Sequence, residues 1–128
     1  MVYNYVIDSY AWVEYFKGTK KGEIAKEFIE TKENATASIT IAELSEKYER
    51  ENKSFEEDMQ FILSRTKIVP LNAEIALESG KVNCVNKKKI KNWGMADAII
   101  LATANKLGAK VVTGDEHFRN LNSIMLDA

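Results

Sequence analysis

The sequence is poor in the residues that form covalent cross-links and soft-metal sites. Its 128 residues contain one cysteine, Cys84, and one histidine, His117. A single cysteine cannot form an intrachain disulfide, and no other cysteine or histidine lies near Cys84 in the sequence to complete a thiolate metal site. We therefore expect a free, partly buried thiol at Cys84.

Long apolar runs are also absent. No run approaches the ~20 residues that cross a bilayer, and the start of the chain, MVYNYVID, lacks the basic segment and apolar stretch of a signal peptide. We expect a cytoplasmic protein that does not bind membranes. The apolar fraction of 45% and the charged fraction of 29% are ordinary for a globular protein. This length fits one domain over residues 1–128.

An excess of positive charge is missing as well, because the formal net charge is −1. Proteins that bind nucleic acids normally carry a basic surface, so the balance counts mildly against that class. If four carboxylates form a metal site, however, the rest of the chain is net positive, and bound cations neutralise the acidic centre. The charge therefore does not exclude a nuclease.

Hydrophobic periodicity predicts strands that alternate with helices. The predicted strands cover residues 4–8, 35–39, 67–69, 110–113 and 123–126, and the predicted helices cover residues 10–16, 20–30, 41–51, 55–64, 72–86 and 95–107. Gly18 and Gly108 are expected to end the first and last helices, and the last helix is apolar nearly all round, which indicates burial. The predicted fold is α/β: a three-layer αβα sandwich with a central, mainly parallel sheet of four to five strands.

Four acids occupy positions that this fold brings to one edge of the sheet. Asp8 and Asp115 follow strands, Asp97 begins the buried helix, and Glu43 lies one turn into the helix after the second strand. Carboxylates gathered in a cleft repel one another unless a cation is bound, so we expect a metal site. Oxygen ligands without clustered cysteine or histidine favour Mg²⁺ or Mn²⁺, which can activate a water nucleophile at a phosphate.

Each acid also has a purely structural interpretation. Asp8 and Asp115 could be helix N-caps, and Asp97 could complement a helix dipole. Thr40 and Glu43 fit the T-x-x-E capping box. It is the conjunction of all four acids that favours a functional site.

Four segments resemble the PIN-domain family, and more narrowly the VapC-type toxin ribonucleases of toxin–antitoxin pairs. They are Val6 to Ser9, Ser38 to Glu43, Ala96 to Ala104, and Val111 to Phe118. The most selective part is Asp97 with its Ala-rich helix, followed by Gly108 and the pattern Thr113-x-Asp115-x-x-Phe118.

The resemblance implies metal-dependent hydrolysis of single-stranded or looped RNA. It also implies a homodimer, an antitoxin partner, a supporting hydroxyl at Thr113 and the metal ligands Asp8, Glu43, Asp97 and Asp115. Tyr10 departs from the pattern, since many relatives have a small hydroxyl or amide there, although Ser9 supplies a hydroxyl one residue earlier. His117 departs too, because some relatives have an acid at that position.

Several other residues have two interpretations each. His117 could protonate a leaving oxygen or be a solvated loop histidine. Trp12, Tyr15 and Phe16 share a helical face that belongs to the core or to a subunit interface. A lysine cluster before the last helix could hold an RNA backbone beside a stacking face on Trp93, or simply be solvated. The cluster comprises Lys87, Lys88, Lys89 and Lys91.

The leading hypothesis is therefore an Mg²⁺- or Mn²⁺-dependent endoribonuclease toxin that is inhibited by a partner protein. The alternatives are a PIN nuclease of RNA processing or turnover, and a PIN-like scaffold that binds RNA or protein without cleaving. A phospho-acceptor receiver domain fits poorly, because paired acids after the first strand and a lysine after a late strand are not evident.

Overall fold

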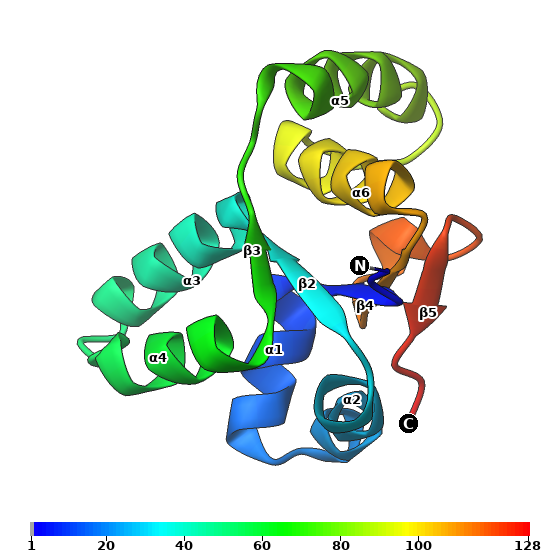
Figure 1. Cartoon of the computed structure of the whole chain (residues 1–128). Helices are drawn as coiled ribbons and strands as arrows, with labels where there is room; N and C mark the ends of the chain where they lie inside the picture. Colours follow the sequence, from blue (N-terminus) through cyan, green and yellow to red (C-terminus); the bar gives the residue numbers. More distant parts are fainter. Residues whose placement is uncertain (1) are drawn as a thin grey trace.

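The computed structural model describes residues 2–128 and has a five-stranded sheet at its centre (Figure 1). The strand order is β3-β2-β1-β4-β5, and every neighbouring pair is parallel. The strands are β1 (Tyr5–Ile7), β2 (Asn34–Ala37), β3 (Lys67–Val69), β4 (Lys110–Thr113) and β5 (Ser123–Met125). The predicted α/β fold with a mainly parallel sheet is confirmed, with five strands.

Pairs of helices connect the first four strands. Helices α1 (Ser9–Lys17) and α2 (Lys20–Thr31) follow β1, α3 (Ser38–Arg50) and α4 (Glu56–Arg65) follow β2, and α5 (Ala73–Asn86) and α6 (Met95–Leu107) follow β3. A short 3-10 turn, η1 (Glu116–Phe118), connects β4 to β5. Within residues 2–128 no helix is both long enough and apolar enough to cross a membrane.

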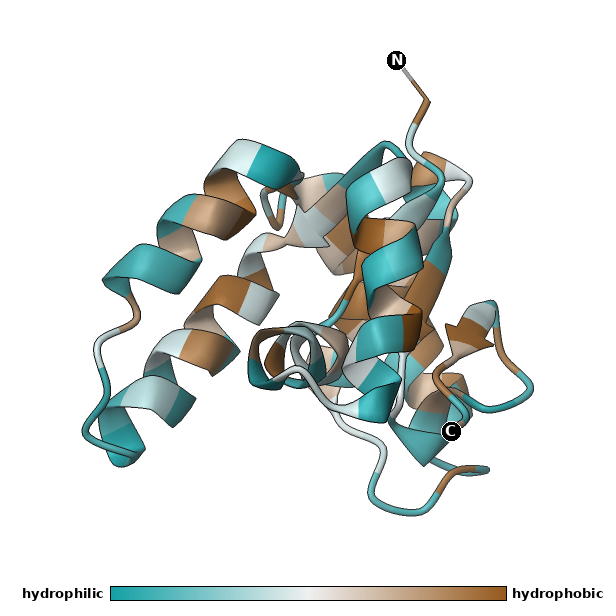
Figure 2. Ribbon diagram, turned by 90° about the horizontal axis from the view of Figure 1, so that it is seen from below, coloured by the Kyte–Doolittle hydropathy of each residue, from teal (hydrophilic) through white to brown (hydrophobic). Residues whose placement is uncertain are grey.

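The sheet buries both of its faces. Val6 and Val111 pack toward α6, whereas their neighbours Ile7 and Val112 pack toward α1, α2 and α4. Full burial of each such side chain contributes about 1.5–3 kcal/mol, and adjacent residues of a strand point to opposite faces. Figure 2 shows hydrophobic residues gathered in the sheet and on the inward sides of the helices. The result is the predicted three-layer arrangement.

Helix α6 is the buried helix that the sequence predicted. Its residues from Ala98 to Ala104 are all buried, and the helix ends at Gly108 in the left-handed conformation, at φ 65°. Gly18 ends α1 in the same way, at φ 68°. These two positions need a backbone conformation that glycine adopts without steric cost.

The start of α3 differs from the prediction. Strand β2 ends at Ala37 and α3 begins at Ser38, whereas residues 38–40 were expected to precede the helix. Ile39 packs on the core beside α6 and Thr40 is fully buried, so tertiary packing overrides the β preference of this short segment. Because Thr40 lies inside the helix, the capping-box interpretation of Thr40 and Glu43 is wrong. Glu43 therefore does not cap the helix.

Two side chains are buried to a different extent than expected. Trp93 is only 3% exposed and packs on Phe118, with ring centroids 5.4 Å apart, so the predicted RNA-stacking face is wrong. Cys84 is exposed rather than partly buried. It lies on α5, whose buried residues, Ile75, Ser79 and Asn86, occupy other positions of the helix.

Strand β1 marks the point where the order of the strands reverses. From β1 the chain proceeds outward to β2 and β3, and then returns to place β4 on the other side of β1. In open parallel sheets the crevice beyond the carboxyl ends of such strands is the usual ligand site. Asp8 immediately follows β1 and Asp115 lies two residues beyond β4, so both acids lie at this crevice.

Candidate active site

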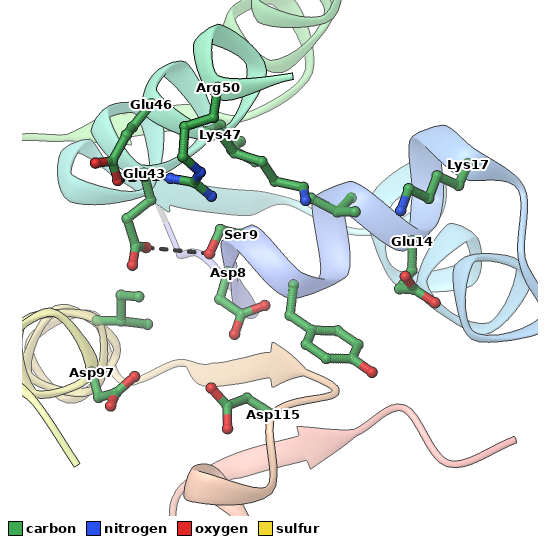
Figure 3. A pocket seen from close by; sticks show the side chains of 14 residues that line it. Asp8, Ser9, Glu14, Lys17, Glu43, Glu46, Lys47, Arg50, Asp97 and Asp115 are labelled. Carbon is green, nitrogen blue, oxygen red and sulfur yellow. Dashed lines mark hydrogen bonds and ion pairs between the residues drawn. The ribbon is translucent and has the colours of Figure 1, made fainter. Parts of the chain in front are cut away.

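All four predicted acids line one cleft of about 480 Å³ at the carboxyl edge of the sheet. Figure 3 shows their carboxylates approaching from four separate elements, with the predicted supporting residue Ser9 among them. The structure therefore brings together acids that are widely separated in the sequence. They are Asp8, Glu43, Asp97 and Asp115.

Asp8 is the most deeply buried of the four, at 3% exposure. It N-caps α1, because its Oδ1 accepts a hydrogen bond from the backbone N–H of Ala11 at 2.9 Å. Burial raises the pKa of Asp8 from 3.8 to about 7, and the charges of Asp115 and Glu43 add to the rise. Hydrogen bonds from Thr113 and Ala11 oppose it. A nearby cation would reverse this penalty on the ionised form.

Glu43 reaches the cleft from the second turn of α3. The hydroxyl of Ser9 donates to its Oε1 at 3.2 Å. Partial burial raises the pKa of Glu43, the bond from Ser9 lowers it, and repulsion from Asp97 and Asp115 raises it further. Ser9 thus supplies a hydroxyl to the site although Tyr10 occupies the position where the family pattern often has one.

Asp97 lies in the first turn of α6, where its Oδ2 accepts a hydrogen bond from the backbone N–H of Gly94 at 3.1 Å. The helix-dipole interpretation of this acid is therefore also correct. The same oxygen lies 3.1 Å from Nδ1 of His117. Asp97 keeps 18% exposure on the cleft side.

Asp115 caps the η1 turn through a hydrogen bond from the backbone N–H of His117 to its Oδ1, at 2.9 Å. Thr113 is fully buried, and its hydroxyl oxygen accepts from the backbone N–H of Asp115 at 2.9 Å. One hydroxyl thus links the last acid to the buried first acid, since it also hydrogen-bonds Asp8.

The structural and the functional interpretations of these acids do not exclude each other, because Asp8, Asp97 and Asp115 cap turns or helices and also line the cleft. Each of the four carboxylates accepts a hydrogen bond from the chain and also lines the cleft. An ionised carboxylate has about four lone-pair sites, so these hydrogen bonds leave room for a ligand. Carboxylate oxygens gathered in one cleft fit a hard divalent cation, and the charges of neighbouring acids raise the pKa of Asp8 and of Glu43. The residues present therefore suit the Mg²⁺ or Mn²⁺ that the sequence predicted.

The cations that line the cleft are Lys17, Lys47 and Arg50. None of the three was among the predicted site residues, although Lys47 and Arg50 lie four and seven residues after Glu43 and so share its helical face. The predicted RNA-binding lysines lie elsewhere, exposed in the segment between α5 and α6, and do not line the cleft. They are Lys87, Lys88, Lys89 and Lys91.

Tyr10 lies at the rim of the cleft because Gly114 has no side chain. A Cβ added at Gly114 would meet Cε1 of the tyrosine ring at 2.2 Å. The ring therefore rests on the backbone between Thr113 and Asp115. The side chain of Lys21 fixes its other end, with Nζ donating to the Tyr10 hydroxyl at 3.1 Å.

Comparisons with known proteins agree with the fold. A toxin–antitoxin complex from Klebsiella pneumoniae shares the fold with a TM-score of 0.79 and 22% identity, and the match covers 97% of this chain and 98% of that one. VapBC2 from Rickettsia felis, bound to a DNA fragment from its promoter, has a TM-score of 0.75 and 22% identity, with coverages of 98% and 97%. The sarcin-ricin-loop-cleaving toxin VapC20 from Mycobacterium tuberculosis has a TM-score of 0.69 and 14% identity, with coverages of 95% and 99%. No curated protein sequence matches.

The sequence itself matches the family model of the PIN domain over residues 5–123. The match spans β1 to the start of β5 and includes every acid of the cleft. The chain belongs to the PIN-domain family.

Proposed function

We propose that this protein is an Mg²⁺- or Mn²⁺-dependent endoribonuclease and the toxin of a toxin–antitoxin pair. The observation that carries the proposal is the convergence of four carboxylates from four elements on one cleft, with the buried Asp8 at its base. Buried carboxylates with raised pKa values are typical of functional sites. PIN-domain membership supports a nuclease, and the toxins among the structural neighbours support the narrower assignment.

The ion would be held by Asp8, Glu43, Asp97 and Asp115. When bound, it would supply a Lewis acid that activates a water molecule and stabilises negative charge on the phosphate. The chain positions the ligands for that task. Ser9 holds Glu43, the turn at Gly94 holds Asp97, and Thr113 connects Asp8 to Asp115.

RNA is the proposed substrate because basic side chains lie beside the acids. Figure 3 shows Lys17, Lys47 and Arg50 on the wall formed by α1 and α3. Lys17 is exposed and makes no ion pair within residues 2–128, so it can bind a phosphate without breaking another contact. Lys47 pairs with Glu51, the residue that caps α3, at 2.7 Å, and Arg50 pairs with Glu46 at 3.2 Å. Such exposed helix pairs contribute about 0.3–0.5 kcal/mol and exchange easily for a phosphate.

An antitoxin protein and a second copy of the chain are the proposed protein partners. Several structural neighbours are VapBC complexes. In this chain Tyr15, Phe16 and Phe61 form a half-buried aromatic cluster outside the cleft, with Tyr15 and Phe61 stacked at 5.7 Å. Trp12 of the same stripe is fully buried and belongs to the core.

Cleavage of structured and unstructured RNAs by purified protein, with Mg²⁺ or Mn²⁺ and with EDTA, tests the proposal. Asp97→Asn should abolish cleavage. Glu14→Gln is the matched control, because Glu14 is an acid of the same cleft outside the carboxylate group. Identical products from wild type and Asp97→Asn would indicate a contaminant. A folded protein that cuts nothing with either ion would favour the non-cleaving scaffold.

Expression in a bacterial host separates a toxin from a nuclease of RNA processing. Wild type without its partner should arrest growth, whereas Asp97→Asn should not. RNA binding is then measured in the inactive Asp97→Asn variant, to compare the cleft lysines with the lysine cluster between α5 and α6. Lys17→Ala and Lys47→Ala should each reduce the salt slope of binding by about 0.7, whereas no change is expected if Lys88 and Lys89 are the RNA contacts instead.

A further inference from the structure

The only histidine of the chain lies against the carboxylate cluster. Nδ1 of His117 is 3.1 Å from Oδ2 of Asp97 and 3.6 Å from Oδ1 of Asp115. One nitrogen and two carboxylate oxygens of these residues all lie within 4.8 Å of one another. The imidazole is 27% exposed, so a hydrated ion can reach it.

The orientation of the ring is set by the fold. His117 is the second residue of η1, and its own backbone N–H donates to Asp115, which holds the side chain on the same side as that carboxylate. The next residue, Phe118, is buried and anchors the turn in the core against Trp93. A tilted contact with Trp93, with centroids 6.5 Å apart, supports the other side of the imidazole.

The spacing of these atoms suits a bound ion. An octahedral ion with ligands at about 2.0–2.1 Å places adjacent ligand atoms about 2.9 Å apart and opposite ones about 4.1 Å apart. The 3.1 Å separation of Nδ1 from Asp97 is close to the adjacent value, and the 3.6 Å separation from Asp115 reaches it if the side chains shift by less than about 1 Å. A neutral imidazole that carries its proton on Nε2 presents a lone pair at Nδ1, which is a common metal ligand.

We propose that His117 is a nitrogen ligand to the divalent ion, together with Asp97 and Asp115. The inference rests on the proposed metal-dependent function and adds a ligand to it. Imidazole binds Mn²⁺ and later transition ions better than Mg²⁺, for which oxygen ligands are favoured. His117 therefore makes the site selective for Mn²⁺ over Mg²⁺.

Pulsed EPR of bound Mn²⁺ tests the proposal directly, because a coordinated histidine nitrogen modulates the electron spin echo. The protein must carry no histidine tag and the buffer no nitrogen ligand. Any strong ¹⁴N coupling then belongs to His117, since the chain has no other histidine. Wild type should show the coupling, and His117→Gln should lose it. Glu116→Gln, at the neighbouring exposed residue, is the matched control and should keep it.

Calorimetric titration gives the second readout. His117→Gln should weaken Mn²⁺ binding by roughly 10-fold or more and Mg²⁺ binding by less than about 3-fold. If Mn²⁺ binds wild type but the EPR shows no nitrogen coupling, the proposed ligand role of His117 is wrong. The metal-dependent function would still stand, and His117 would be a positioning residue that donates a hydrogen bond to Asp97. Failure of wild type to bind Mn²⁺ at all would overturn both this inference and the proposed metal-dependent function.

Discussion

Asp8→Asn should stabilise the metal-free protein at neutral and alkaline pH, although it removes a candidate metal ligand. The amide keeps the N-cap, because its Oδ1 can accept from the N–H of Ala11, and Asn caps helices as well as Asp does. It removes the cost of holding a negative charge at a site that is 3% exposed. The variant therefore isolates the energetic cost of the buried carboxylate.

The size of the effect follows from the pKa of Asp8, which burial raises from 3.8 to about 7. Because protonated Asp8 favours the folded state, its contribution to stability is complete below about pH 4 and is lost as the pH rises to 7. At 1.36 kcal/mol per pH unit, the loss at pH 8 is about 4 kcal/mol. The pKa of about 7 already includes the opposing hydrogen bonds from Thr113 and Ala11, so nothing further is subtracted for their loss. The expected gain at pH 8 is therefore about 4 kcal/mol.

Urea denaturation in EDTA at pH 5, 6, 7 and 8 measures this difference, since single domains of this size usually unfold in two states. The gain of the variant over wild type should grow by about 1.4 kcal/mol per pH unit below pH 7 and then level off. Saturating Mn²⁺ should stabilise wild type and not the variant. A gain that does not change with pH, or a variant less stable than wild type at pH 8, would refute the reasoning.

Three further outcomes are expected. Thr113→Val removes a hydrogen bond that lowers the pKa of Asp8, so the acid limb of the pH–rate profile should move to higher pH, and Thr113→Ser should restore it. Gly114→Ala should cost about 1–3 kcal/mol in urea denaturation because of the clash with the Tyr10 ring, and adding Tyr10→Ala should recover most of it. Mn²⁺ binding should release about one proton at pH 6 and none from Asp8 at pH 8.5, measured by calorimetry in buffers of different ionisation enthalpy.

Local patterns were sufficient to predict most of the fold. β-Branched runs such as Lys110 to Thr113 and the apolar helix before Gly108 lie where the sequence placed them. The positions of the four acids at strand ends and helix starts were also enough to predict that they share one edge of the sheet. These features depend on the topology and on few long-range details.

Features that depend on packing were not predictable in the same way. Helix α3 begins early because Ile39 and Thr40 enter the core, and Trp93 is buried against Phe118 rather than exposed near the lysine cluster. The basic wall of the cleft can be predicted only if it is known that α1 and α3 line the same cleft. The direction of the His117 ring likewise depends on how the η1 turn is anchored, which no spacing in the sequence reveals.

The double use of the acids has a consequence for how this protein can change over generations. At Asp8 and Asp115 the carboxylate both closes a turn or helix and lines the cleft. An amide satisfies the first task as well as an acid does, but it ligates a divalent cation poorly. A single substitution can therefore silence the chemistry and leave the shape whole. Selection for a folded protein thus gives these positions no protection against loss of the acid, and only selection on activity itself can keep it there.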